Sequence, residues 1–427
     1  MVDHESLRRW LNDTKSRGMA LGLANTNRAL QHLSLPPCEF ETIHIAGSNG
    51  KGTLVATLCA ALSCCQIPNL AFTSPHLVRV EERIRLNGIP VQTDLFDEAL
   101  VAIFKICELH QLVLTYFEIT YLAAMYIAHH SAINVLILET GLGGRLDATR
   151  TARADVSVLT ALSLEHTDIL GDTLLAIAKE KAAIARPNRP LIARWCEDGA
   201  VREVIEQTAL QAGIDELNES RKAAQIYWVE MTDNMTAEQE GRRLAHQTWQ
   251  YLQTTKQLSF PNFSSIQWPA RMQLLQSPNR HDCHYLIDGA HNPSGMEKSC
   301  AELLARQEIR SPWLLLVGCT PQRDVAAMFT PLFQLCREFP PVATVITVPQ
   351  GGRYLGVDEH VLADLFRQAN LPPDTVFGRP SDAVAWIEDS GLYFNTVISI
   401  GSLYMQGNVL EALGLVSDEV LSIQAKI

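Results

Sequence analysis

Residues 44–53, His-Ile-Ala-Gly-Ser-Asn-Gly-Lys-Gly-Thr, join an apolar run at Thr42–Ile45 to an apolar helical stretch at Leu54–Cys65. A strand, a glycine-rich turn and a helix in this order direct backbone N–H groups at a phosphate. The glycines tolerate positive φ and allow a close approach to an anion. Lys51 adds positive charge, and Thr53 offers a hydroxyl to a nucleotide-bound magnesium ion. The stretch therefore predicts a nucleoside triphosphate site within a parallel α/β fold.

The spacing of this stretch differs from the usual phosphate-binding pattern. Ile45 stands where that pattern has its first glycine, and Gly52 separates Lys51 from the hydroxyl residue Thr53. A glycine-rich turn that binds no ligand is the alternative, and motifs elsewhere in the chain have to decide between the two.

Length and composition limit the possible classes of protein. The chain has 427 residues, of which 47% are apolar and 19% charged, so two globular domains are expected. A net charge of −12 argues against a general nucleic-acid or anionic-membrane partner. No apolar run reaches transmembrane length, and the N-terminal residues lack a secretory pattern. Ten cysteines without a C-x-x-C pair suit reduced thiols, so we expect a cytoplasmic protein.

Strand-length apolar runs alternate with helical patterns along both halves of the chain. The first half has such runs at 134–138, 155–161 and 191–195, and helical patterns at 19–33, 96–110, 119–130, 201–212 and 238–254. The second has runs at 284–287, 313–317, 343–348 and 396–400, and helical patterns at 296–306, 360–369 and 383–389. This alternation predicts an α/β fold of two doubly wound domains, residues 1–266 and a smaller Rossmann-like domain at 267–427.

Glu139 is a candidate metal ligand on its position alone. It ends the apolar run at 134–138 and precedes a glycine-rich turn. A buried parallel strand that ends in this way places its acid at the carboxyl edge of the sheet, where ligands bind in open α/β folds. We expect Glu139 to bind magnesium.

Five motifs together resemble those of the dihydrofolate synthase/folylpolyglutamate synthase family, relatives of the Mur ligases. They are Gly-Ser-Asn-Gly-Lys-Gly-Thr (47–53), Thr-Ser-Pro-His-Leu (73–77), Gly-Leu-Gly-Gly-Arg-Leu-Asp-Ala-Thr (141–149), Glu-His-Thr-Asp-Ile-Leu-Gly (165–171) and Asp-Gly-Ala-His-Asn-Pro (288–293). The resemblance covers nearly the whole chain except roughly residues 195–265. It implies a Mur-ligase-like ATP-binding domain, a C-terminal ligase domain and an active site in the cleft between them. Four residues depart from the family pattern: Ser48 for threonine, Glu165 for aspartate, and Ala183 and Ala270 for glycine.

The resemblance implies two Mg²⁺ ions, a K⁺ ion and ATP as co-substrate. Ser74 and Glu139 match ligands of one magnesium ion, while His166 and a carbamylated Lys181 match ligands of the second. The residues implied in catalysis are Lys51, His166, Lys181 and His291.

The resemblance also assigns residues to the two larger substrates. Those implied in ATP binding are Ser48, Asn49, Gly50, Lys51, Gly52, Thr53, Asn234, Arg271 and Asp288. Those implied in binding the pterin or folate are Leu21, Gly22, Leu23, Phe117, Glu118, Leu146, Asp147 and Ala148.

The implied reaction is formation of an amide from ATP, an acid and L-glutamate. The acid is dihydropteroate, or the γ-carboxylate of a (tetrahydro)folyl-glutamate, or both in turn. Its carboxylate attacks the γ-phosphate to give an acyl phosphate, the amine of glutamate captures this, and ADP and phosphate leave. The partners are then small molecules alone, with no nucleic acid and no membrane, and we expect a monomer.

Three other interpretations compete with this one. A Mur-type ligase would need a site for a UDP-sugar, and the Gly-Lys-Gly loop followed by the motif at 141–149 argues against it. A ligase of the same family redirected to another carboxylic acid would explain the four substituted positions. A non-catalytic nucleotide-binding protein would keep the loop but lose the metal ligands, whereas Ser74, Glu139, His166 and Lys181 are all present.

Overall fold

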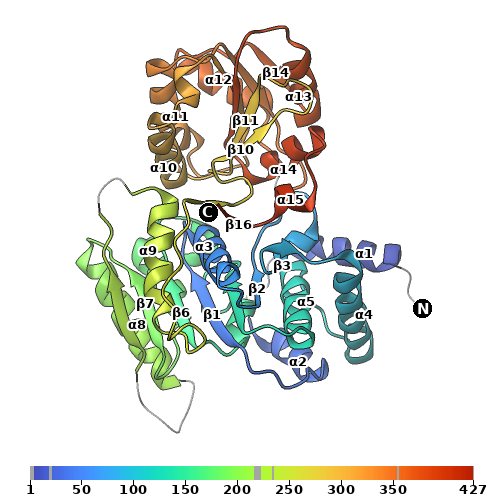
Figure 1. Ribbon diagram of the computed structural model, residues 1–427, viewed down its shortest axis with the longest axis vertical. Coiled ribbons are helices and arrows are strands. Elements are labelled where there is room, and N and C mark those ends of the chain that lie inside the picture. Colours follow the sequence, from blue (N-terminus) through green and yellow to red (C-terminus); the bar gives the residue numbers. More distant parts are fainter. Residues whose placement is uncertain (1–3, 19–21, 216–222, 233–234, 353–354, 427) are drawn as a thin grey trace. The chain divides into compact units, whose positions relative to one another are not determined.

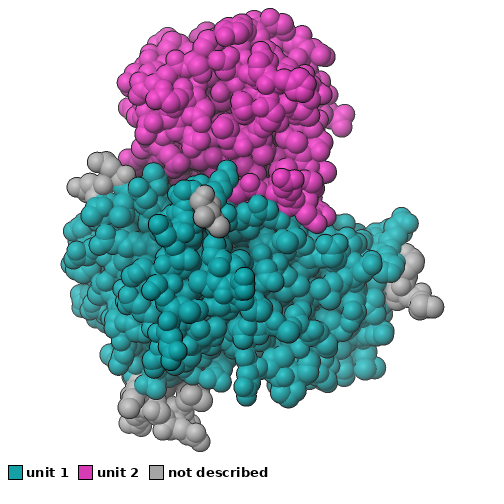
Figure 2. All heavy atoms as spheres, viewed as in Figure 1, with its two compact units in different colours: residues 1–75, 80–266, 422–427 teal, residues 76–79, 267–421 magenta. Residues whose placement is uncertain are grey.

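The computed structural model describes residues 4–18, 22–215, 223–232, 235–352 and 355–426. The chain forms two compact units, drawn in different colours in Figure 2. Unit 1 consists of Met1–Pro75, Val80–Ile266 and Ser422–Ile427, and unit 2 of His76–Arg79 and Gln267–Leu421.

Unit 1 is built on an eight-stranded sheet in the order β4-β3-β2-β5-β1-β6-β7-β8 (Figure 1). Its strands are β1 (Glu41–Ala46), β2 (Asn69–Phe72), β3 (Ile84–Leu86), β4 (Ile89–Pro90), β5 (Val135–Glu139), β6 (Val156–Leu159), β7 (Pro190–Arg194) and β8 (Gln225–Val229). The six strands from β2 to β8 in this order run parallel, and β3 and β4 add antiparallel strands at one edge. The central strands β1, β5 and β6 are buried except for Glu41 at the start of β1, as expected for parallel strands that helices cover on both faces.

Helices cover both faces of this sheet. On one face α3 (Lys51–Cys64) packs on β1, β2 and β5, and α9 (Ala237–Trp249) on β6, β7 and β8. On the other face α5 (Tyr116–His130) packs on β2 and β5, while α7 (Leu174–Ala182) and α8 (Gly199–Asp215) pack on β6 and β7. The remaining helices of the unit are α1 (His4–Asp13), α2 (Ala24–His32), α4 (Thr93–His110), α6 (Thr167–Leu170) and the 3₁₀ turns η1 (Thr14–Arg17), η2 (Val80–Arg83) and η3 (Ala148–Thr151).

Unit 2 has a six-stranded sheet in the order β10-β11-β15-β12-β13-β14, parallel except for β10. The strands are β10 (Gln273–Gln276), β11 (His284–Asp288), β12 (Trp313–Val317), β13 (Ala343–Thr347), β14 (Thr375–Phe377) and β15 (Thr396–Ile400). One face is covered by α10 (Pro293–Leu304), α11 (Val325–Glu338) and α12 (Glu359–Gln368), and the other by α13 (Pro380–Asp389) and α14 (Leu403–Ala412). The shorter elements of unit 2 are η4 (Glu308–Arg310) and α15 (Asp418–Leu421). A separate two-stranded sheet pairs β9 (Ser265–Gln267), at the boundary between the units in the sequence, with β16 (Gln424–Lys426) of unit 1.

The predicted α/β fold with two doubly wound sheets is confirmed. The sequence reading missed α11, although its buried residues Met328, Phe329, Leu332 and Phe333 follow a helical spacing, because Pro331 interrupts the pattern. It also missed β8, a strand whose residues are mostly half-buried and so lack a continuous apolar run. Within the described ranges, no helix combines the length and apolar character needed to cross a membrane.

The aromatic cluster of unit 2 provides a test of its core. Phe366 is 1% exposed and packs against Phe329 and Phe333, with ring centroids 5.8 and 4.9 Å away. Phe366→Ala should cost about 3–5 kcal/mol and lower the melting temperature, measured by calorimetry. Val361→Ala on the same helix is the control, because Val361 is 62% exposed and its truncation should change stability by less than about 0.5 kcal/mol. Equal effects of the two substitutions would contradict the packing described.

Candidate active site

The glycine-rich turn at residues 47–53, here called the phosphate loop, lies against the segment that follows β6. The backbone N–H groups of Ser48 and Asn49 donate to the carbonyl oxygen of Ala161 at 2.8 and 3.2 Å. Thr160 Oγ1 donates to the carbonyl oxygen of Asn49 at 2.8 Å. A Cβ on Gly47 would lie 1.8 Å from that hydroxyl oxygen, so only glycine allows this close approach.

The end of the phosphate loop presents the first turn of α3. Gly50 is the N-cap residue and is left-handed, with φ 86°. The N–H groups of the first helical residues, Lys51, Gly52 and Thr53, have no acceptor within the helix. Together with the helix dipole they favour an anion, as the sequence predicts for this position.

Two lysines converge on the phosphate loop. Lys51 Nζ donates to the carbonyl oxygens of Gly47 at 2.8 Å and Ser48 at 3.3 Å. Lys181, in α7, is 1% exposed and donates to the same Gly47 oxygen at 2.9 Å. Glu165 Oε1 lies 2.6 Å from Lys181 Nζ and supplies the compensating negative charge. The sequence analysis named Lys51, Lys181 and Glu165 separately but did not predict their contact.

The charges of this cluster shift the pKa values of its members. Burial opposes the charged form of Glu165, but Lys51 and Lys181 outweigh it and lower the pKa of Glu165 to about 2. Burial, with repulsion from Lys51, lowers the pKa of Lys181 to about 8. Partial burial of the ring, with the charges of Lys181 and Lys51, lowers the pKa of His166, so its imidazole is neutral near pH 7 and able to bind a metal. His166 itself is the left-handed N-cap residue of α6, with φ 46°.

Ser74 and Glu139 meet at the carboxyl edge of the sheet. They follow or end the neighbouring parallel strands β2 and β5, where Phe72 pairs with Leu138. The backbone N–H of Ser74 donates to Glu139 Oε2 at 3.3 Å, and Glu139 is 5% exposed. Glu139 also pairs in register with Ile45, two residues before Gly47. The pair therefore lies one strand away from the phosphate loop.

A hydroxyl and a carboxylate suit a hard divalent cation. No three His, Cys, Asp or Glu side chains gather into a metal-binding group within the described part of the chain. An ion held by Ser74 and Glu139 would therefore take its other oxygen ligands from water or from nucleotide phosphates. These residues fit a divalent cation, such as Mg²⁺, that accompanies nucleotide phosphates.

The residues predicted to bind the pterin or folate, here called the acid-binding residues, all belong to unit 1. Phe117 and Glu118 lie at the start of α5. Phe117 is half-buried, and a Cβ on Gly141 would lie 2.5 Å from its ring, so the ring lies directly on the glycine-rich loop. Glu118 is occupied locally, because it accepts from Thr26 Oγ1 and from the N–H and Oγ1 of Thr115 at 2.8 Å each. This capping box and the bond to α2 stabilise the start of α5.

The other predicted acid-binding residues lie at the loops that end β5 and precede α2. Asp147 is 5% exposed and its carboxylate accepts hydrogen bonds from its own loop, while Leu146 is half-buried and Ala148 buried. Gly22 has φ 145°, and Leu23 precedes α2. Leu21, and Asn234 among the predicted ATP-binding residues, lie outside the described residues.

Three predicted residues belong to unit 2. The carboxylate of Asp288, at the end of β11, accepts from the N–H groups of Met272 and Ala290 and from Ser299 Oγ at 3.1, 2.9 and 2.7 Å. Arg271 Nη1 would be 2.3 Å from a Cβ on Gly289, so the guanidinium lies over this glycine. His291 Nδ1 lies 2.8 Å from the carbonyl oxygen of Gly289. Asp288 therefore holds the loop that carries Arg271, a role that its motif did not indicate.

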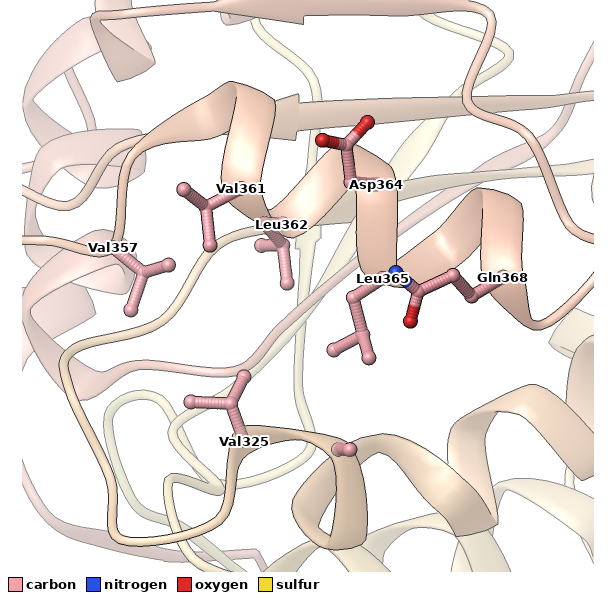
Figure 3. Close-up of a pocket in the computed structure, with 8 residues that line it drawn as sticks. Val325, Val357, Val361, Leu362, Asp364, Leu365 and Gln368 are labelled. Carbon is pink, nitrogen blue, oxygen red and sulfur yellow. The ribbon is translucent and has the colours of Figure 1, made fainter.

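A pocket elsewhere in unit 2 contains none of these residues. Its volume is about 330 Å³, and it lies between the start of α11 and α12 (Figure 3). Its walls are mostly aliphatic: Val325, Ala326, Val357, Val361, Leu362 and Leu365, with Asp364 and Gln368 at one side. Among the described residues that line it, none has a cationic side chain.

Known proteins resemble this chain in sequence and in fold. No protein-family model matches the chain. A probable dihydrofolate synthetase of Schizosaccharomyces pombe is 30% identical over 300 residues, which cover 64% of this chain and 69% of that protein. The chain belongs to the dihydrofolate synthase/folylpolyglutamate synthase family.

Two further matches cover almost the full length of this family member. The dihydrofolate synthase/folylpolyglutamate synthase of Bacillus subtilis is 24% identical over 450 aligned positions, covering 96% of this chain and 99% of that protein. A crystal structure of a bifunctional folylpolyglutamate synthase/dihydrofolate synthase with Mn, AMPPNP and L-glutamate matches with a TM-score of 0.77 at 24% identity. It covers 96% of this chain and 98% of that one, and at this identity it establishes the fold.

The close approach at Gly47 makes a prediction about the phosphate loop. Gly47→Ala should destabilise the protein by about 1–3 kcal/mol, because the backbone at φ 152° and Thr160 both oppose a side chain. The melting temperature measures this loss. Gly199→Ala is the control, because Gly199 has no contact closer than 3.7 Å to an added Cβ. A melting temperature for Gly47→Ala equal to that of the control would show that the loop is misplaced.

Proposed function

We propose that this chain is an ATP-dependent ligase that joins L-glutamate to dihydropteroate, to the γ-carboxylate of (tetrahydro)folyl-glutamates, or to both. The observation that supports it most is the convergence of Lys51, Lys181 and Glu165 at Gly47 of the phosphate loop, beside the Ser74–Glu139 pair. The names of the relatives supply the substrates, and the solved relative contained L-glutamate and an ATP analogue.

The proposed mechanism assigns charge neutralisation and positioning to the residues of unit 1. The N–H groups at the start of α3 and the Lys51 ammonium hold the triphosphate. Ser74 and Glu139 would hold one Mg²⁺, and His166 with Lys181 as its carbamate would hold a second. Bound divalent ions neutralise charge on the phosphates. The acid's carboxylate attacks the γ-phosphorus, and the amine of glutamate then displaces phosphate from the acyl carbon.

The other assignments follow the family motifs. In this proposal residues 1–266 form the ATP-binding domain and residues 267–427 the ligase domain. The nucleotide is bound by Ser48, Asn49, Gly50, Lys51, Gly52, Thr53, Asn234, Arg271 and Asp288, with His291 among the catalytic residues. The acid is bound by Leu21, Gly22, Leu23, Phe117, Glu118, Leu146, Asp147 and Ala148. We also propose a K⁺ ion, a monomeric state and a cytoplasmic location.

Lys51 tests the nucleotide site. Lys51→Met keeps most of the side-chain stem and removes the ammonium, so turnover of ATP should fall by about 100- to 1000-fold. Production of ADP measures turnover, and Lys105→Met on α4 serves as a matched control that should leave it unchanged. Turnover that survives in Lys51→Met would contradict the phosphate-loop assignment.

The chemistry is tested with purified protein, ATP, magnesium, glutamate and a panel of acids that includes dihydropteroate and tetrahydrofolate. With ¹⁸O in the acid's carboxylate, one label should appear in the released phosphate, because the bridging oxygen of the acyl phosphate leaves with phosphorus. Mass spectrometry of the phosphate measures this transfer. Release of AMP and pyrophosphate, or unlabelled phosphate during amide formation, would refute the acyl-phosphate mechanism. Amide formation only with another acid would favour the redirected ligase, and no turnover with any acid would favour a nucleotide-binding protein.

A further inference from the structure

A buried chain of hydrogen bonds runs from the middle of β1 to the glycine-rich loop after β5. His44 Nε2 lies 2.8 Å from Thr149 Oγ1, and both residues are completely buried. Thr149 donates through its hydroxyl and its N–H to Asp147 Oδ1. Asp147 Oδ2 accepts the N–H groups of Gly141 and Leu142 at 2.9 Å each.

The position of each proton follows from what these groups can donate. A threonine hydroxyl has one proton, and the carboxylate of Asp147 can only accept, so Thr149 donates to Asp147. The hydroxyl oxygen of Thr149 must then accept from His44, which places the imidazole proton on Nε2. Burial raises the pKa of Asp147, but four donors on its two oxygens stabilise the charged form.

The imidazole of His44 is neutral in this arrangement. Burial, with repulsion from Arg186 and Arg150, lowers its pKa well below the usual value. Its Nδ1 is buried and has no hydrogen-bond partner among the described residues. An unpaired buried acceptor lowers the free energy of unfolding by about 1–3 kcal/mol. An aliphatic side chain at position 44 would avoid this cost. The Nε2–H donor is what an aliphatic residue could not supply.

We propose that His44 is a positioning residue for the acid substrate: through Thr149 and Asp147 it fixes the loop at 140–147 relative to the strand that carries the phosphate loop. Among the described residues, one backbone hydrogen bond joins this loop to β1 in addition to the pairing of β1 with β5. It runs from the N–H of Thr140 to the carbonyl oxygen of Ile45 at 2.9 Å. The loop that follows contains three glycines and depends on Asp147 for its shape. This inference rests on the proposed function, in which the loop binds the acid.

Two substitutions of His44, to glutamine and to asparagine, differ in where they place a side-chain N–H donor. The amide nitrogen of glutamine can reach the position of Nε2, whereas that of asparagine can reach only the position of Nδ1. His44→Asn should raise the KM for the acid by about tenfold, the loss of one hydrogen bond, and leave the Kd for ATP within about twofold. His44→Gln should keep both constants near those of the wild type. Equal KM values for the two variants, or an equal loss of ATP affinity, would overturn the proposal.

A double-mutant cycle separates this role from simple packing. Thr149→Val breaks the same chain at its next link, so combining it with His44→Asn should add little to the effect of either alone. Additive effects on the KM for the acid would show that the two residues act independently.

Hydrogen exchange provides a readout that needs no turnover. The amides of Gly141 and Leu142 should exchange faster in His44→Asn than in His44→Gln, and the amides of the phosphate loop should not change. Unchanged exchange would refute the positioning role even if the wild type is an active ligase. Faster exchange in a protein that ligates no acid would refute only the proposed function.

Discussion

The carbonyl oxygen of Gly47 accepts hydrogen bonds from two lysines, and the rest of the site depends on how their charges are balanced. Two ammonium groups on one buried oxygen repel each other, and Glu165 offsets this repulsion from 2.6 Å. The arrangement also requires the phosphate loop to lie close to Thr160, which only a glycine at position 47 permits. Gly47, the buried salt bridge between Lys181 and Glu165, and the segment after β6 therefore depend on one another.

Parallel strands bring the remaining groups to the same edge. Ser74 and Glu139 come from neighbouring strands, and Glu139 is in register with Ile45 on the strand that leads into the phosphate loop. In a parallel sheet every strand ends at the same edge, and the turns that lead into the following helices lie there. Residues far apart in the chain therefore meet at this edge as a consequence of the topology. This explains why one fold can position both an anion cradle and a carboxylate.

Local patterns in the sequence predicted the elements and the residue types of the site, but not the partners of those residues. The run at 42–45 and the glycines after it predicted β1, the phosphate loop and α3, and Glu139 was placed correctly at a strand end. In contrast, nothing local to Lys181 shows that it is 1% exposed or that it reaches residue 47, because that contact joins residues 134 positions apart. Asp147, Glu118 and Asp288 were predicted as ligand contacts, and their motifs did not reveal that each carboxylate also binds backbone donors of its own unit. The sequence analysis missed α11 for a different reason. A proline usually ends a helix, but here α11 continues through Pro331, and its aromatic residues Phe329 and Phe333 pack together.

The buried charges argue for function more than for stability. Replacing a buried ion pair by apolar residues of similar size is often neutral or stabilising, because desolvation offsets the attraction. Lys181 and Glu165 have side chains 2% and 14% exposed, and the pKa of Lys181 falls to about 8, so its ammonium is held at the expense of folding free energy. The buried Nδ1 of His44, which has no hydrogen-bond partner in the described part of the chain, is a second penalty of this kind, on the strand that carries the same loop. A sequence with such groups departs locally from what packing alone favours. These departures lie around the phosphate loop, where a bound triphosphate would supply the counter-charge for Lys51, whose ammonium here donates to backbone carbonyl oxygens.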